Sequence, residues 1–183
     1  MAVRYKPPYI SENTYFITFT ILGWKYIFTE LKYFNLIYKW FDYCLENYQN
    51  KIHGYVIMPN HIHVLMYLSD ESPDIAKLVQ NAKRFLAYQI VELLYQDEEQ
   101  EILDTMKSRA RVDKKARHKV FEDKYDSKLI DRDLFNEKLN YIHNNPCQEK
   151  WRLVKRPEYY IHSSAANYLL GKGYYNNVEI ITT

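Results

Sequence analysis

Residues 51–68 read KIHGYVIMPNHIHVLMYL and carry the clearest fold signal in the chain. Two apolar runs, 51–58 and 61–68, are joined at Pro59-Asn60. Proline and asparagine favour tight turns, and β-branched or aromatic runs of this length are typical of strands. The stretch therefore predicts a β-hairpin with two neighbouring antiparallel strands.

The segments on both sides of the hairpin alternate between strand and helix patterns. The expected elements are a strand at 14–22, a helix at 29–49, the hairpin, a helix at 72–96, a strand at 120–125, a helix at 131–145 and a short tail helix within SSAANYLLGK. Thr29 is the expected N-cap of the first helix, and Ser72 or Asp74 lies near the cap of the second. Pro146 should end the third helix, and Gly171 should close the tail helix.

This order, β-α-β-β-α-β-α followed by a tail, predicts an α+β fold in which helices pack on an antiparallel sheet. The chain of 183 residues has the length of one well-packed domain, and no repeat or linker divides it. We therefore expect a single domain over residues 1–183, with a C-terminal tail from about residue 147.

Composition narrows the class of protein. A hydrophobic content of 47 % with 26 % charged residues is typical of a folded chain. The net charge of +2 does not by itself indicate a nucleic-acid partner, although a local basic patch still can. Cys44 and Cys147 form no CxxC pair, which excludes zinc-knuckle and redox motifs and favours a reducing compartment. With no recognisable signal peptide or membrane-spanning run, we expect a cytoplasmic protein without a membrane partner.

His61 and His63 are the first candidate site residues. Side chains alternate between the two faces of a strand, so these two imidazoles should point the same way while Ile62 points the other way. Two imidazoles on one face can share a metal ion. The alternative is a pair of histidines on a half-buried face whose hydrogen bonds are all made within the protein. An HxH pair alone does not decide between them.

Tyr141 and Asn145 form a second candidate group. They are four residues apart in the expected last helix and so lie on the same helix face. The amide oxygen of Asn145 is a hard ligand that suits Mg²⁺ or Mn²⁺ better than zinc. Tyr141 would then lie one turn from the metal. The alternative is that Tyr141, one of 19 tyrosines, only packs on the helix.

The third feature is a separation of charge after residue 96. Residues 97–104 are acidic, whereas 107–119 hold seven Lys or Arg against one Asp. The basic stretch is either a solvated helix extension or loop, or an arm that contacts phosphates. The candidate DNA-contacting residues are Lys83, Arg84, Arg109, Arg111, Lys114 and Lys115.

Four motifs in this order resemble the REP-associated tyrosine transposases, which belong to the HUH class of single-tyrosine, single-strand DNA transposases. They are YFITFT from residue 15, GYVIMPNHIHVL from 54, KLNYIHNNP from 138 and SSAANY from 163. The resemblance covers most of the chain. Two departures are Trp151, where the family has a small residue, and Leu86, where it has threonine; both could alter DNA recognition.

The resemblance implies a ferredoxin-like or RRM-like antiparallel sheet with flanking helices. It implies that His61 and His63 are the two metal-binding histidines, that Asn145 is the third ligand and that Tyr141 is the nucleophile. It also implies single-stranded or hairpin DNA as the partner, often with action as a homodimer. A bacterial, nucleoid-associated location when bound to DNA follows from the same likeness.

The expected function is metal-dependent cleavage and transfer of single-stranded DNA through a 5′-phosphotyrosine intermediate, with Mg²⁺ or Mn²⁺ as the cofactor. Two alternatives remain within this class of partner. One is a protein that binds hairpin or single-stranded DNA without cutting it, and the other is a metal nuclease that uses activated water, with Tyr141 structural. A third alternative, an RNA-binding protein with a similar sheet, lacks the aromatic-glycine RNP motif.

Overall fold

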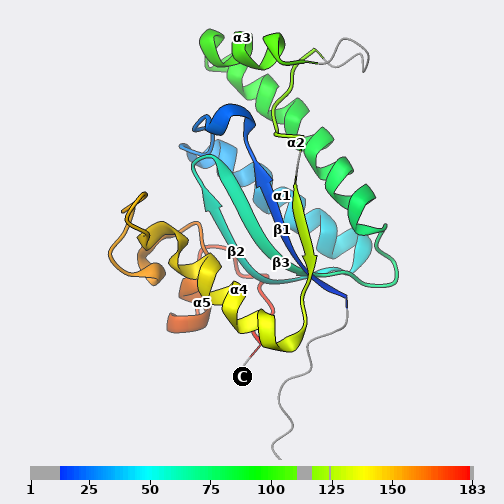
Figure 1. Ribbon diagram of the computed structural model, residues 1–183, viewed down its shortest axis with the longest axis vertical. Coiled ribbons are helices and arrows are strands. Elements are labelled where there is room, and N and C mark those ends of the chain that lie inside the picture. Colours follow the sequence, from blue (N-terminus) through cyan, green and yellow to red (C-terminus); the bar gives the residue numbers. More distant parts are fainter. Residues whose placement is uncertain (1–12, 111–116, 124, 182–183) are drawn as a thin grey trace, which may run out of the picture.

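The computed structural model of the chain describes residues 13–110, 117–123 and 125–181. A four-stranded sheet lies at its centre, formed by β1 (Thr14–Thr20), β2 (Lys51–Met58), β3 (His61–Tyr67) and β4 (Asp126–Leu129) (Figure 1). The strand order is β2-β3-β1-β4, and every neighbouring pair is antiparallel. This order, with the helices between the strands, confirms the expected ferredoxin-like α+β fold.

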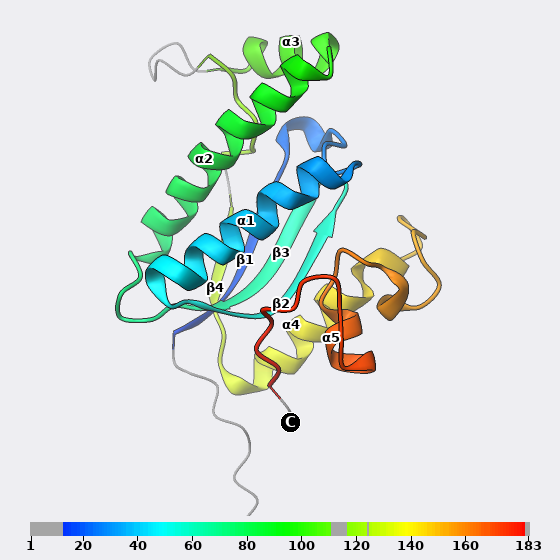
Figure 2. The same cartoon turned by 180° about the vertical axis from the view of Figure 1, so that it is seen from behind.

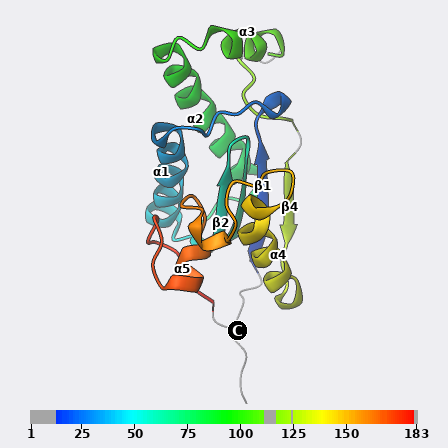
Figure 3. The ribbon, with the colours of Figure 1, turned by 90° about the vertical axis from the view of Figure 1, so that its left-hand side faces the viewer.

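Helices cover both faces of the sheet. α1 (Leu31–Tyr48) and α2 (Ile75–Gln96) lie across one face, as Figure 2 shows from behind. α4 (Arg132–Asn144) lies on the other face with α5 (Ala165–Leu170) beside it, and Figure 3 shows the sheet between α1 and α4. No helix in the described ranges combines the length and the apolar character needed to cross a membrane.

The alternation of side chains along β3 supplies both layers of the core. Ile62 and Val64 are buried against α1 and α2. Leu65 lies on the opposite face, where it packs with Phe135 and Ile142 of α4. Because the period of a strand is two residues, the histidines at 61 and 63 share the α4 face with Leu65. The central strand thus places two imidazoles in the layer between sheet and helix.

The segment after α4 covers the outer edge of the sheet. β2 is an edge strand, and its Ile57 N–H donates to the His162 carbonyl at 2.9 Å while Ser164 N–H donates to the Tyr55 carbonyl at 3.0 Å. Farther along the tail, Glu179 N–H donates to the Ile52 carbonyl at 2.8 Å. These bonds occupy backbone groups that an uncovered edge would offer to another chain. The tail therefore belongs to the packed structure.

Several expected elements agree with the structure. The hairpin is present, Asp74 caps α2 by accepting a hydrogen bond from the Lys77 N–H at 2.9 Å, and Gly171 closes α5 with a φ of 72°. α4 ends at Asn144, directly before Asn145 and Pro146.

Two expectations about element boundaries are wrong, and one helix was not predicted. Thr29 is not the cap of α1; the helix begins one residue later, with Glu30 at the cap and no side-chain hydrogen bond there. The last strand is at 126–129 and not at 120–125, because Phe121 makes only an isolated bridge with Ile21 while Asp126–Leu129 pairs with β1. The acidic stretch contains a helix, α3 (Gln100–Ser108), whose Leu103 and Met106 are buried.

The tail is anchored by a buried histidine, which makes stability depend on pH. The His162 ring stacks on Phe34 at a centroid distance of 3.4 Å, and its Nδ1 is 2.9 Å from the Tyr38 hydroxyl. Burial lowers the pKa of His162 to about 4. Since the unfolded chain binds this proton near pH 6.5, the stability is fully present above that pH and decreases as the pH falls towards about 4.

We therefore expect the wild type to lose more stability on acidification than His162→Gln, which has no proton to bind. Between pH 7 and about pH 4.5, the unfolding free energy of the wild type should fall by about 2 kcal/mol more than that of His162→Gln. Urea unfolding at both pH values measures it. Equal losses in the two proteins would show that protonation of His162 does not oppose folding.

Candidate functional site

The two histidines lie where the expected alternation puts them, on the α4 face of the central strand. His61 and His63 are 4 % and 6 % exposed, and their ring centroids are 4.8 Å apart. β3 pairs with β1 so that His63 lies opposite Thr18. The Thr18 hydroxyl is 2.8 Å from the His63 Nδ1. Strand register thus supplies a hydrogen-bond partner for the Nδ1 side of His63.

Asn60 fixes the protonation of His61. The Asn60 amide Nδ2 donates to the Trp24 carbonyl at 3.1 Å, which leaves its Oδ1 as the atom facing the His61 Nδ1 at 2.7 Å. An amide oxygen only accepts, so the proton of His61 is on Nδ1 and the Nε2 lone pair is unprotonated. Outer hydrogen bonds of this kind orient the histidines of metal sites.

Both imidazoles are neutral at neutral pH. Burial lowers the pKa of His61 to about 4, and the positive charge of Lys150 contributes. Burial also lowers the pKa of His63 to about 3, with smaller contributions from His61 and Lys150. Neutral imidazole is the form that binds a metal ion.

Tyr141 faces these histidines from α4. Its ring lies 5.2 Å from the His63 ring, edge to face at 70°, and 6.1 Å from the Phe16 ring. Phe16 in turn stacks on His63 at 5.3 Å. Tyr141 is nevertheless 41 % exposed. The side chain is held against the histidines while part of it stays in contact with solvent.

Asn145 lies one turn after Tyr141, at the C-cap of α4. It is fully buried, and neither its amide oxygen nor its amide nitrogen has a hydrogen-bond partner among the described residues. The His63 Nε2 is also buried without a partner there. A buried polar group left unpaired costs about 1–3 kcal/mol, so native proteins rarely keep one without a reason.

This donor set fits a divalent ion. In the described parts of the chain, no three His, Cys, Asp or Glu side chains gather into a metal-binding group, so two imidazoles need a different third ligand. The unpaired amide oxygen of Asn145, which follows α4 directly, is a candidate hard donor. Imidazole nitrogens with an amide oxygen suit Mn²⁺ and Mg²⁺ and contain no thiolate that would favour zinc.

The candidate DNA-contacting residues lie elsewhere. Lys83 and Arg84 line a groove of about 680 Å³ between α2 and residues 117–123, on the helical layer opposite α4. The Lys83 Nζ donates to the Glu122 carbonyl at 2.7 Å, whereas Arg84 is exposed. Arg109 is exposed at the end of α3. Arg111, Lys114 and Lys115 lie outside the described residues. The structure does not bring Lys83, Arg84 or Arg109 to the histidines, and a role of any of the six residues in binding DNA stays a prediction.

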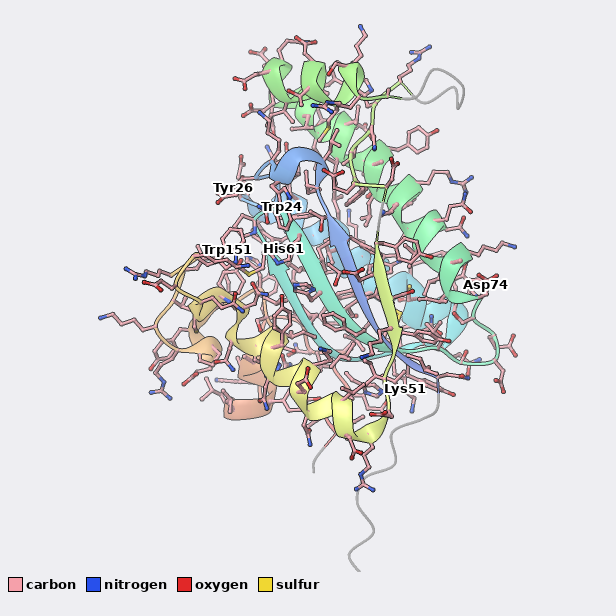
Figure 4. All side chains as sticks on the ribbon, viewed as in Figure 1. Trp24, Tyr26, Lys51, His61, Asp74 and Trp151 are labelled. Atoms are coloured by element: carbon pink, nitrogen blue, oxygen red, sulfur yellow. The ribbon has the colours of Figure 1, made fainter. Side chains whose placement is uncertain are left out.

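Sequence reasoning did not assign several residues around the histidines to the site. Thr18 and Asn60 make the hydrogen bonds of the two imidazoles, and the Trp24 and Trp151 rings lie 6.0 and 5.6 Å from the His61 ring (Figure 4). Asn60 precedes His61 directly, which is a usable signal. Thr18 could have been found from strand alternation once the β1–β3 register was known.

Comparison with known proteins gives a match only at the level of structure. No family model matches the chain, and no curated protein matches it. A candidate transposase from Deinococcus radiodurans R1 aligns with 78 % of this chain and 97 % of its own, at 13 % identity and a TM-score of 0.48.

A structure of a REP-associated tyrosine transposase bound to a REP hairpin aligns with 100 % of this chain and 94 % of its own. The TM-score is 0.61 and the sequence identity is 15 %. The two chains thus share their fold over nearly their full lengths. The resemblance seen in the sequence motifs is confirmed as a likeness of structure: this chain has the fold of a REP-associated tyrosine transposase.

Proposed function

We propose that the protein cleaves and rejoins single-stranded or hairpin DNA through a covalent bond to Tyr141. The observation that carries the proposal is the contact between the Tyr141 and His63 rings, which puts a partly exposed phenol beside two buried, neutral imidazoles. The solved relative with this fold is bound to a REP hairpin, which supports DNA as the partner. A homodimer is the expected assembly.

His61, His63 and Asn145 would hold Mg²⁺ or Mn²⁺ through two imidazole Nε2 atoms and an amide oxygen. The divalent ion, when bound, polarises a phosphate and offsets the negative charge that develops on it. Asn60 keeps the proton of His61 on Nδ1, and Thr18 can accept the Nδ1 proton of His63. Both Nε2 lone pairs would then be unprotonated and able to bind the ion.

In the proposed reaction, the phenolic oxygen of Tyr141 attacks the phosphorus of a phosphodiester. A bond forms between this oxygen and phosphorus, and the bond from phosphorus to the 3′ oxygen breaks. The phenol loses its proton and the leaving 3′ oxygen gains one, which gives a 5′-phosphotyrosine and a free 3′ hydroxyl. A later 3′ hydroxyl can reverse the step, so strands can be rejoined without a nucleotide cofactor.

Phe16 and His63 contribute to this step by fixing the direction of the tyrosine. Their stacked rings both meet the Tyr141 ring edge to face, while its exposure leaves the phenol within reach of a strand. Holding a nucleophile in an attacking geometry removes much of the entropic cost of the reaction. A tyrosine that was only a core residue would not need this exposure.

The nucleophile is tested with labelled single-stranded DNA from the regions that flank the gene, incubated with Mn²⁺ and separated on an SDS gel. Wild type should form a covalent protein–DNA adduct, and Tyr141→Phe should reduce its yield by about a thousandfold or more because the attacking oxygen is gone. Tyr159→Phe is the matched control, since Tyr159 is 59 % exposed and lies outside the site.

The two alternative functions predict different products on the SDS gel. Cleavage that persists in Tyr141→Phe without an adduct would point to a nuclease that uses activated water. Binding without cleavage or adduct, on strands from both flanks, would indicate a recognition protein without turnover.

The metal ligands are tested without DNA. Mn²⁺ at about 100 times its dissociation constant should raise the melting temperature of wild type by about 5 °C. His63→Ala and Asn145→Ala should remove most of this shift because each deletes a ligand. His118→Ala replaces a histidine that lines the α2 groove and should keep the full shift.

Differential scanning calorimetry with and without Mn²⁺ measures the shift in melting temperature. Electron paramagnetic resonance of the free ion measures how much Mn²⁺ each protein binds. A full shift in His63→Ala and Asn145→Ala would mean that the ion binds elsewhere.

A further inference from the structure

Three aromatic side chains lie together beside His61, two of them in ring contact with it. Trp24 and Tyr26 come from the loop between β1 and α1, and Trp151 comes from the segment after α4 (Figure 4). The Trp24 ring lies 6.0 Å from the His61 ring, and the Trp151 ring lies 5.6 Å from it. The Tyr26 and Trp151 rings are 6.1 Å apart. We call Trp24, Tyr26 and Trp151 the aromatic rim.

Two of the three rings in the aromatic rim leave much of their surface in water, and the third, Trp151, is partly buried. Trp24 is 58 % exposed and Tyr26 is 59 % exposed, whereas the chain's remaining tryptophan, Trp40, is 3 % exposed in the core. Exposing large apolar rings gives up the free energy that burying them would provide. Several such rings together are typical of a surface that binds something.

The backbone that presents the rim is held in an unusual conformation. Trp24 has a φ of 57° and Arg152, next to Trp151, has a φ of 46°. Left-handed geometry is costly for a bulky side chain and concentrates where function requires it. For Trp24, the Asn60 amide stabilises this geometry by donating to its carbonyl at 3.1 Å. The same Asn60 side chain accepts from His61, so the rim and the histidine are coupled through one residue.

Positive charge lies beside the rings. The Lys150 ammonium lies 5.7 Å from the centre of the Trp151 ring, and its charge also acts on both His61 and His63. Lys150 is exposed, and no carboxylate in the described parts of the chain pairs with it in a salt bridge. Flat exposed rings with an adjacent cation match the two parts of a nucleotide, the base and the phosphate.

We propose that the aromatic rim is a stacking site for an unpaired base close to the phosphodiester that Tyr141 attacks, with Lys150 contacting the backbone phosphate. This inference rests on the proposed function for its DNA substrate and names how the strand is held. Stacking on the rim would place the adjoining phosphate next to His61. Because every base has an aromatic face, the site fixes the position of the strand more than its sequence.

The test measures binding without cleavage. Tyr141→Phe is used as the background, with EDTA present, so the result does not depend on whether Tyr141 is a nucleophile. The probes are an oligothymidylate of about 16 nucleotides and a strand of the same length that carries abasic sites throughout. Binding is followed by fluorescence anisotropy of the labelled strand and by tryptophan emission. Only Trp24 and Trp151 can report a stacked base, since Trp40 is buried.

The background protein should bind oligothymidylate about tenfold more tightly than the abasic strand, with quenched tryptophan emission. Adding Trp24→Ala and Trp151→Ala should remove this difference. Adding Trp24→Phe and Trp151→Phe should keep the affinity within about threefold, because flat rings for stacking remain. The quenching should disappear, because the two tryptophans that report a stacked base are gone. The phenylalanine pair keeps the test valid if the alanine variants fold poorly.

Tyr43→Ala is the matched control, because Tyr43 is 49 % exposed on α1, on the other side of the sheet. It should change the affinity by less than about twofold. Equal affinity for the two strands, or an equal loss in Tyr43→Ala, would overturn the proposal. A third result would also overturn it. If wild type self-associates in sedimentation experiments, and the two alanine substitutions abolish this association without changing the affinity for oligothymidylate, the rim is an interface between copies of the chain.

The outcomes separate this inference from the proposed function. If wild type forms the adduct at Tyr141 but the two alanine substitutions leave oligothymidylate binding unchanged, the proposed cleavage reaction is supported and the stacking site is rejected. Rim-dependent binding without any adduct would support the stacking site and reject the nucleophile.

Discussion

β3 is paired on both sides and covered on both faces, and this arrangement controls the rest of the molecule. Its pairing with β1 and β2 sets the register of the sheet, and its alternating side chains supply Ile62 and Val64 to one core and Leu65 to the other. A slip of one residue would exchange these faces. The same period of two puts His61 and His63 together beneath α4, so the geometry of the candidate site and the packing of the core depend on one register.

The site uses polar residues in places where apolar ones would stabilise the fold better. His61, His63 and Asn145 are buried, yet the His63 Nε2 and both polar atoms of the Asn145 amide have no partner in the described residues. Each unpaired group works against folding. The hydrogen bonds from Thr18 and Asn60 orient the opposite edges of the imidazoles and leave the Nε2 edges open. A bound ion that takes the His63 Nε2 and the Asn145 amide oxygen as ligands accounts for two of these unpaired atoms together, which is why we favour a metal site over a packed histidine pair.

The parts of the fold that could be predicted are those in which pattern and packing agree. The hairpin is recognisable because its apolar runs and its Pro59-Asn60 turn point to the same structure. β4 was misplaced because Asp126–Leu129 is polar and pairs through its backbone at a sheet edge, whereas the apolar Val120 and Phe121 are buried without forming a strand. α3 was missed because its acidic sequence hides a short apolar face of Leu103 and Met106.

For the site, the HxH pair and the spacing of Tyr141 and Asn145 could be read from the sequence, and their roles came from the family resemblance. Their surroundings could not be read in this way. Thr18 depends on strand register, and the aromatic rim depends on two loops far apart in sequence whose backbone geometry no local pattern predicts. Trp151 was noticed only as a departure from the family pattern. Its place beside His61 gives that departure a physical meaning.

The central claim is that His61, His63 and Asn145 bind one ion next to Tyr141. Crystals grown with Mn²⁺ and measured for anomalous scattering test it most directly, because the ion is located without reference to activity. We predict one strong peak within bonding distance of the two Nε2 atoms and the Asn145 amide oxygen, about 2.0–2.3 Å from each. A peak bound elsewhere, or histidines that keep their places with no ion at saturating Mn²⁺, would contradict the account.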